Sequence, residues 1–415
     1  MKSTTCLLTF VALSAAALSA ATPSIRTDSV TVSQNADTRL VTIGYTLEDA
    51  DAVVTVDVLT NGVSIGVENF SNIDGDANRR VAPGDRLAVW HPRASWPDHV
   101  FTDGEVSVEV RAWDVATPPD YMVVDLACTS APVRYYVSEK ALPEGGLTNN
   151  LYRTTKLVMR RIPAKGNVWT MGSPADEPGR VTTREERHLV TMTNDYYLGV
   201  FPVTISQHRL VVGNDPTPSN IKGSDGDYAP VCGRSWEHLR GASVNWPTDG
   251  HAVGPNCNLK IWRNLTGIDF DLPTSAQWEF ACRAGTSTRF YYGEDENRLG
   301  DYAWYAGNAG DKVHRVGEKI PNGFGLYDLY GNIWEWCLDW AGESNSDSVV
   351  EPVGPTAGDS QNRRVNRGGN YFAQSVADYL AQSVASCRSA KINPTAKNTY
   401  YGYGYRLLCP PTLKW

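Results

Sequence analysis

The segment from residue 322 to residue 340 constrains the fold more than any other part of the chain. It concentrates glycines, acidic residues and aromatic side chains in a pattern that the overall composition does not explain. From Ile333 onward, apolar residues occupy every second position. Three tryptophans and Leu338 therefore share one face, while Glu335, Cys337 and Asp339 share the other. This alternation predicts a half-buried strand whose indole rings form one wall of a core.

The N-terminus predicts export. Lys2 precedes an apolar run from Cys6 to Leu18, and small residues then lead to Pro23, which is typical of a secretory signal peptide over residues 1–21. No later stretch approaches the roughly 20 apolar residues that a bilayer span needs. We therefore expect no membrane insertion, and a mature protein that is secreted, periplasmic or on the cell surface.

The charge balance argues against nucleic acid as a partner. The chain carries a formal net charge of −8, and its lysines and arginines do not form the clusters that phosphate binding requires. Its length is typical of two or three domains. No feature of the sequence indicates an oligomeric state.

Residues 23–135 are predicted to form an all-β domain. Short runs rich in β-branched residues alternate with turn-forming pairs such as Asn61-Gly62 and Pro83-Gly84. About seven short strands over this length are typical of an immunoglobulin-like or fibronectin-like sandwich. Because sandwiches serve many purposes, the sequence indicates only a spacer or docking role for this one.

Residues 136–154 are predicted to be a linker, because proline, glycine and polar residues dominate them. The rest of the chain, residues 155–415, is rich in glycine and tryptophan and shows few helical patterns. Its clearest helix begins after Thr274, where Gln277 completes a capping box, and ends at Gly285. We therefore expect an α+β protein whose first domain is all-β.

A series of motifs resembles the formylglycine-generating enzyme, or sulfatase-modifying factor, superfamily over residues 155–409. The motifs are Arg161-Ile162-Pro163, Met171-Gly172-Ser173, Pro202-Val203-Thr204, Leu272-Pro273-Thr274, residues 277–285, residues 322–340, Arg367-Gly368-Gly369, Cys387-Arg388-Ser389 and Gly404-Tyr405-Arg406. The resemblance implies a variant of the C-type lectin fold with little regular secondary structure.

The residues that carry this family's chemistry differ in the present chain. In members that convert a sulfatase cysteine to formylglycine, two cysteines follow an Arg-Gly-Gly-Ser motif and hold copper(I). Here the motif serine is Asn370, and counting without gaps from Gly369 places Ala373 and Asp378 at the cysteine positions. Copper(I) prefers soft thiolates, which none of these residues supplies. We therefore expect no bound copper and no catalytic residues for this oxidation.

A structural calcium ion is implied by the same resemblance. The matching ligands are the carboxylates of Asp328 and Glu335 and the main-chain oxygens of Gly331 and Ile333. Hard oxygen donors, two of them anionic, suit Ca²⁺. The alternative is a turn in which both carboxylates accept hydrogen bonds without any metal.

Seven cysteines follow the predicted signal peptide, and an exported protein favours disulfides. The family resemblance assigns the Cys387 region to a structural disulfide, for which Cys282 is the candidate partner.

The family's ligand cleft corresponds to a tyrosine-rich stretch near the C-terminus. Tyrosines mixed with serine, asparagine and glycine are typical of recognition surfaces. The candidate cleft residues are Trp334, Asn370, Tyr371, Tyr379 and Tyr401. Trp334 has the alternative role of filling the core.

These features predict a secreted, non-catalytic member of the family whose cleft binds a peptide, protein or glycan ligand. One alternative is a formylglycine-generating or related metal-dependent oxidase acting on sulfatase-type cysteine substrates. A second alternative is a structural protein of the cell envelope or surface.

Overall fold

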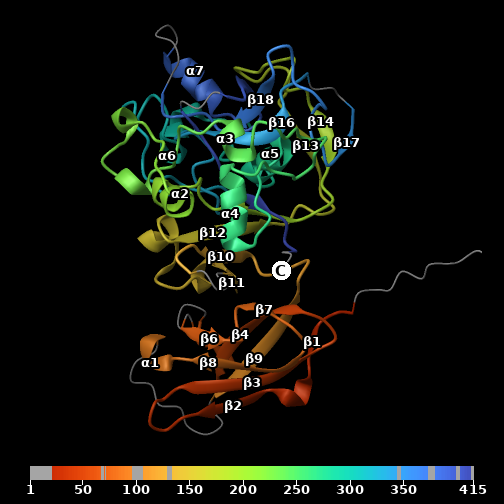
Figure 1. Cartoon of the computed structure of the whole chain (residues 1–415), viewed down its shortest axis with the longest axis vertical. Helices are drawn as coiled ribbons and strands as arrows, with labels where there is room; N and C mark the ends of the chain where they lie inside the picture. Colours follow the sequence, from red (N-terminus) through yellow and green to blue (C-terminus); the bar gives the residue numbers. More distant parts are fainter. Residues whose placement is uncertain are drawn as a thin grey trace, which may run out of the picture.

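The computed structural model describes residues 21–66, 70, 72–95, 106–128, 133–343, 347–372, 379–398 and 402–412. Figure 1 shows a smaller part at the bottom, which is built mostly of strands and holds the short helix α1 (Pro92–Ser95), and a larger part above it that holds the other labelled helices. Residues 1–20 of the predicted signal peptide lie outside the described ranges. Within those ranges, no helix combines the length and the apolar character that a membrane crossing needs.

Two antiparallel sheets make up the N-terminal part. One has the order β1-β3-β8-β6 with β2 also paired to β3, and the other has the order β5-β4-β7 with β9 also paired to β4. One buried cluster contains Ile43 and Trp90 from the first sheet and Val58 from the second. The two sheets therefore pack face to face. The elements are β1 (Ser24–Ile25), β2 (Thr31–Gln34), β3 (Val41–Glu48), β4 (Ala52–Thr60), β5 (Val63–Ser64), β6 (Ile73–Gly75), β7 (Arg79–Val81), β8 (Gly84–Trp90), α1 (Pro92–Ser95) and β9 (Val106–Asp114).

Two strands that begin within the expected N-terminal domain, residues 23–135, belong to the larger part instead. β10 (Tyr121–Asp125) pairs with β11 (Val133–Tyr136) on one side and with β12 (Lys156–Ile162) on the other. The two faces of β10 are buried in two different clusters, Met122 in one and Val123 in the other. The two sheet systems therefore divide between β9 and β10, before the expected boundary at residue 135.

The stretch expected as a linker, residues 136–154, is packed against the larger part. It forms three 3-10 turns, Glu139–Ala141, Gly146–Thr148 and Asn150–Arg153. Leu142, Leu147 and Tyr152 are buried in the same cluster as Val158 of β12. Its glycines serve tight turns here, because Gly145 and Gly146 both have positive φ.

Among the described residues, three further sheets and six helices complete the C-terminal part. The sheets have the orders β11-β10-β12-β15-β21, β13-β14-β17 and β19-β18-β16-β20. The remaining strands are β13 (Val168–Met171), β14 (His188–Thr191), β15 (Tyr196–Gly199), β16 (Trp334–Trp340), β17 (Val349–Val350), β18 (Arg363–Arg367), β19 (Asn393–Ala396), β20 (Tyr403–Gly404) and β21 (Leu408–Cys409). The helices are α2 (Ile205–Val212), α3 (Trp236–Arg240), α4 (Asn258–Thr266), α5 (Ser275–Arg283), α6 (Leu299–Tyr302) and α7 (Tyr379–Ser386).

Strand β16 is buried on both faces. Trp336 and Leu338 lie in one core cluster, while Cys337 lies in another. The two faces match the sequence prediction, but the expectation of a half-buried strand was wrong, because the whole strand is buried. The acidic face is tolerated since the Glu335 carboxylate pairs with Arg406 and the Asp339 carboxylate accepts the Ser275 N–H.

The predicted helix is α5, and it carries the predicted capping box. The Thr274 hydroxyl accepts the Gln277 N–H, and the Gln277 side chain accepts the Thr274 N–H. The helix is capped at Ala284, whose φ is 46°, one residue before the expected Gly285. A buried ion pair between Glu279 and Arg367, with 3.0 Å between Oε2 and Nη1, ties α5 to β18.

Asp339 gives the fold a specific pH dependence. Burial raises the pKa of its carboxyl group from 3.8 to about 6, although the Ser275 N–H bond opposes this. An acid whose pKa is raised by folding stabilises the folded state most when it is protonated, so its contribution falls as the pH rises from about 4 to about 6. Between about pH 4 and about pH 7, wild type should therefore lose up to about 3 kcal/mol of unfolding free energy relative to Asp339→Asn.

Urea unfolding of both proteins across this pH range measures the difference. Asp176→Asn, which alters an exposed aspartate, is the matched control and should follow wild type. A constant difference between Asp339→Asn and wild type at every pH would contradict the assignment.

Candidate functional site

A cavity of 340 Å³ lies between β16, α7 and the segment that follows β18. Trp334 and Asn370, two of the predicted cleft residues, both line it. Trp334 also belongs to the core, where it is only 5% exposed, so it fills the core and lines the cavity at once. The other lining residues are Gly179, Phe372, Gln382, Ser383, Ala385, Ser386, Lys391 and Asn393.

Asn370 brings an unsatisfied amide to this cavity. Among the described residues, its buried Nδ2 atom has no hydrogen-bond partner. The preceding Gly369 has a φ of +81°, and a Cβ there would lie 2.8 Å from Sγ of Cys387, so only glycine fits. A buried donor without a partner costs about 1–3 kcal/mol, which an oxygen atom of a ligand would recover.

Lys391 is a cleft residue that the sequence reasoning missed. Burial lowers the pKa of its ammonium group. The signal in the sequence was that Lys391 closely follows the Cys387-Arg388-Ser389 motif. The Arg388 guanidinium is held by Glu185, and the main chain turns after it, because the Lys391 N–H donates to the Arg388 carbonyl.

The other predicted site residues fall in three places. Tyr371 is buried in the core beside Phe372, with 4.9 Å between the ring centroids, and is not among the cavity's lining residues. Tyr379 begins α7, and its side chain is outside the described set. Ala373, Asp378 and Tyr401 lie outside the described residues, so their predicted places remain predictions.

Asp328 carries a buried carboxylate that accepts hydrogen bonds from two neutral donors, the Gly317 N–H and the Asn332 side chain. It sits in the turn before β16 with a φ of 54° and is buried. Burial raises the pKa of its carboxyl group to about 6, even though Oδ2 accepts the Gly317 N–H at 2.7 Å. A cation at this carboxylate would remove the desolvation cost of its charge.

Glu335, the other predicted carboxylate ligand, is already neutralised. The Arg406 guanidinium donates to both of its oxygens, with the shortest bond 2.7 Å long from Nη2 to Oε1. The Trp278 indole N–H donates to Oε2 at 2.7 Å. The set of Asp328, Gly331, Ile333 and Glu335 therefore fits calcium only in part, because the oxygens of Glu335 are occupied by other donors.

The predicted Cys282–Cys387 disulfide is not formed in the structure, in which both thiols are free. The two sulfur atoms have different neighbours. Cys282 lies near the side chains of Tyr330 and Ser389, and Cys387 lies near the Gly331 backbone. Burial raises the pKa of each thiol to about 12, so neither is a reactive thiolate.

A larger cavity, of 670 Å³, lies around β14, β17 and the start of α5. Two of its acidic lining residues are held in the fold, since Glu279 pairs with Arg283 and Arg367, and Asp339 accepts the Ser275 N–H. It shares no lining residue with the 340 Å³ cavity. The smaller cavity, which we call the Trp334 cleft, is the candidate site.

Known proteins resemble the C-terminal part of this chain. The chain is 30% identical over 173 residues to the formylglycine-generating enzyme of Mus musculus, which covers 38% of this chain and 45% of that protein. It is 28% identical over 181 residues to the chaperone protein LppX of Paenibacillus barcinonensis, covering 35% of this chain and 63% of that protein. Among solved structures, Treponema denticola variable protein 1 aligns with a TM-score of 0.47 and 25% identity, over 62% of this chain and 96% of that one.

The chain spans about half the length of the curated relatives it matches. Residues 159–409 match the family model described as the sulfatase-modifying factor enzyme 1-like domain. Because this match covers more than half of the 415 residues, the chain belongs to the family of sulfatase-modifying factor enzyme 1-like domains.

Proposed function

We propose that this chain is a non-catalytic recognition protein of its family, and that the Trp334 cleft binds a peptide segment of another protein. The observation that carries the proposal is a cavity with ligand-binding groups at a place where the family's chemistry has changed. The Trp334 cleft has an indole wall and an unsatisfied amide at Asn370, the position of the motif serine, whereas the positions of the copper-binding thiols hold Ala373 and Asp378.

The chemistry of the cleft supports a polar, uncharged or acidic ligand. The Asn370 amide supplies a donor for a carbonyl oxygen, and the hydroxyls of Ser383 and Ser386 line the same cavity. Lys391, a basic residue, also lines this cavity. A volume of 340 Å³ is near the lower end of ligand pockets, which suits a few residues of an extended chain.

We further propose that the N-terminal sheets form an immunoglobulin-like spacer and that the protein is exported. Two antiparallel sheets with a shared core support the first point. The signal-like segment before Pro23 supports the second. A spacer would hold the Trp334 cleft away from an attachment surface.

Peptide binding is expected to depend on Asn370. The full mature chain is screened against an immobilised peptide library, with a glycan array in parallel, and the strongest ligand is titrated. Asn370→Ala should weaken binding by about tenfold or more, since it removes the donor without changing the strand that carries Trp334. Asn297→Ala, at an exposed asparagine of the same domain, should bind like wild type.

Unchanged affinity in both Asn370→Ala and Trp334→Phe would place the ligand elsewhere on the protein. Selective binding to the glycan array alone would replace the peptide with a carbohydrate in the same cleft.

The oxidase alternative has its own test. Incubation of the chain with a Cys-x-Pro-x-Arg peptide, copper and oxygen should leave the peptide cysteine unchanged by mass spectrometry, because the chain lacks the soft ligands at residues 373 and 378. A formylglycine-generating enzyme assayed in parallel shows that the conditions support turnover. Aldehyde formed by this chain would overturn the non-catalytic proposal.

Calcium at Asp328 is a separate proposal, supported by the raised pKa of this buried carboxyl group. At a free calcium concentration 100 times Kd, binding would stabilise the fold by about 2.7 kcal/mol. EDTA should therefore lower the Tm of wild type at neutral pH, and excess CaCl₂ should restore it.

The calcium effect should be absent in Asp328→Asn, and it should shrink below about pH 6, where Asp328 is protonated. Asp176→Asn again serves as the matched control. A wild-type Tm that is the same in EDTA and in CaCl₂ would leave the hydrogen-bonded turn as the correct description.

A further inference from the structure

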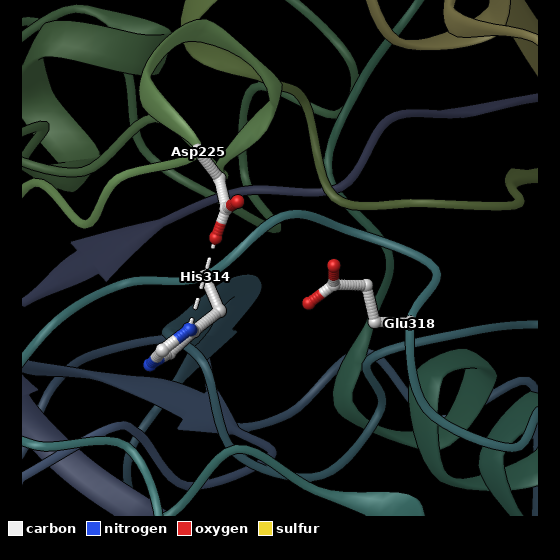
Figure 2. Close-up of side chains that lie close together, drawn as sticks. All are labelled: Asp225, His314 and Glu318. Atoms are coloured by element: carbon white, nitrogen blue, oxygen red, sulfur yellow. Dashed lines mark ion pairs between the residues drawn. The ribbon is translucent and has the colours of Figure 1, made fainter.

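Three side chains with metal-binding atoms converge at a place that neither the Trp334 cleft nor the turn at Asp328 includes. They are Asp225, His314 and Glu318, and one ligand atom from each lies within 4.8 Å of the other two. Asp225 precedes the 3-10 turn Gly226–Tyr228, whereas the other two residues come from the loop after the bridge between Lys222 and Val313. Figure 2 shows the Glu318 carboxylate directed toward the gap between the other two side chains.

The hydrogen bond of His314 fixes which ring nitrogen can bind a metal. Nε2 lies 2.8 Å from the Ala309 carbonyl oxygen, which only accepts, so Nε2 carries the proton of the neutral imidazole. The lone pair on Nδ1 then faces Oδ2 of Asp225 at 3.8 Å, which is too long for a hydrogen bond. The lone pairs of His314 Nδ1 and Asp225 Oδ2 thus face each other, and a cation bound between the two atoms would accept both.

The surroundings hold the imidazole in this orientation. The His314 ring stacks on Trp304, with 3.9 Å between centroids and 14° between planes. The Asn332 side chain accepts the His314 N–H at 3.1 Å and donates to its carbonyl at 3.0 Å. A backbone carbonyl on the far nitrogen is the usual outer partner of a metal-binding histidine, because it sets the tautomer and the ring angle.

Nearby cations are turned toward other partners. The Arg315 guanidinium donates to Asn150 Oδ1 at 2.6 Å and lies over the Tyr228 ring. The Lys319 ammonium group donates to the Gly300 carbonyl at 2.6 Å and lies 3.9 Å from the Trp304 ring centroid. The two carboxylates at the cluster are therefore not neutralised by direct ion pairs with these groups.

We propose that Asp225, His314 and Glu318 bind a divalent transition-metal ion of the Zn²⁺ type. One imidazole and two carboxylates leave room for water in the fourth position, and the imidazole favours Zn²⁺ over Ca²⁺. Ligand atoms that are each about 2.1 Å from an ion lie at most about 4.2 Å apart. The 3.8 Å pair already meets this limit, and a small rotation of the exposed Glu318 side chain brings in the third ligand.

The bound ion would join two segments that are distant in sequence. It would fasten the turn at Asp225 to the loop at residues 314–318, whose Gly317 N–H donates to Asp328. None of the three ligands lines the Trp334 cleft, so metal binding can be tested separately from recognition.

Isothermal titration of the chelator-stripped full chain with ZnCl₂ tests the site. Wild type should bind one ion per chain. Glu318→Gln changes an exposed side chain and should fold normally, yet its affinity for Zn²⁺ should fall by about tenfold or more. His314→Gln should lose the saturable site. Asp227→Asn, at a neighbouring aspartate that pairs with Arg209, is the matched control and should keep wild-type affinity.

Thermal unfolding without metal checks that each variant is folded. Zn²⁺ should raise the Tm of wild type and Asp227→Asn, should raise that of Glu318→Gln less at the same concentration, and should leave that of His314→Gln unchanged. No saturable Zn²⁺ binding by wild type would overturn the proposal. Equal Zn²⁺ affinity in wild type and in folded Glu318→Gln and Asp225→Asn would also overturn it.

Discussion

The buried Arg406 guanidinium holds the centre of the C-terminal part together. Its side chain has no exposed surface, and it donates to the Glu335 carboxylate and to the carbonyls of Gly199, Val200 and Tyr327. These partners belong to β15, β16 and their flanking turns, so a single group fixes the position of the strand that carries Trp334. Removal of one partner of such a buried pair costs about 3–5 kcal/mol, because the other charge is left unpaired.

Two other arginines of this domain, Arg153 and Arg388, also donate hydrogen bonds to main-chain carbonyls outside the sheets. Short strands leave many main-chain oxygens without ladder partners, and a guanidinium offers five donors in a fixed plane. Arg153 donates to the carbonyls of Leu147 and Val316, and Arg388 donates to those of Gly179 and Ala385 while pairing with Glu185. Buried arginines thus do much of what sheet hydrogen bonds do elsewhere.

The sequence predicted those features that depend on residues close together in the chain. The capping box at Thr274 and the two faces of β16 are of this kind. Burial and strand pairing depend on partners distant in sequence. The burial of the acidic face of β16 was not readable, since it requires Arg406, 71 residues after Glu335. The pairing of β10 with β12 likewise depends on a partner beyond the expected linker. In the cleft, Trp334 and Asn370 were found through motif positions, whereas Tyr371 was misplaced because a tyrosine-rich stretch does not say which rings turn inward.

The histidine cluster and the cleft are coupled through Asn332. Its side chain holds the His314 main chain on both sides, and its own carbonyl accepts the Tyr371 N–H at 3.1 Å. Asn332 has a φ of 58° and is buried, so its backbone has little freedom to adjust. If His314 moves and all three hydrogen bonds stay intact, Asn332 and the segment that carries Asn370 and Tyr371 move with it. The alternative is that one of the three hydrogen bonds breaks. An ion on His314 would favour the first outcome, because it holds the loop in one arrangement. The order of the cleft would then depend on metal at a site outside it, with no ligand shared between the two.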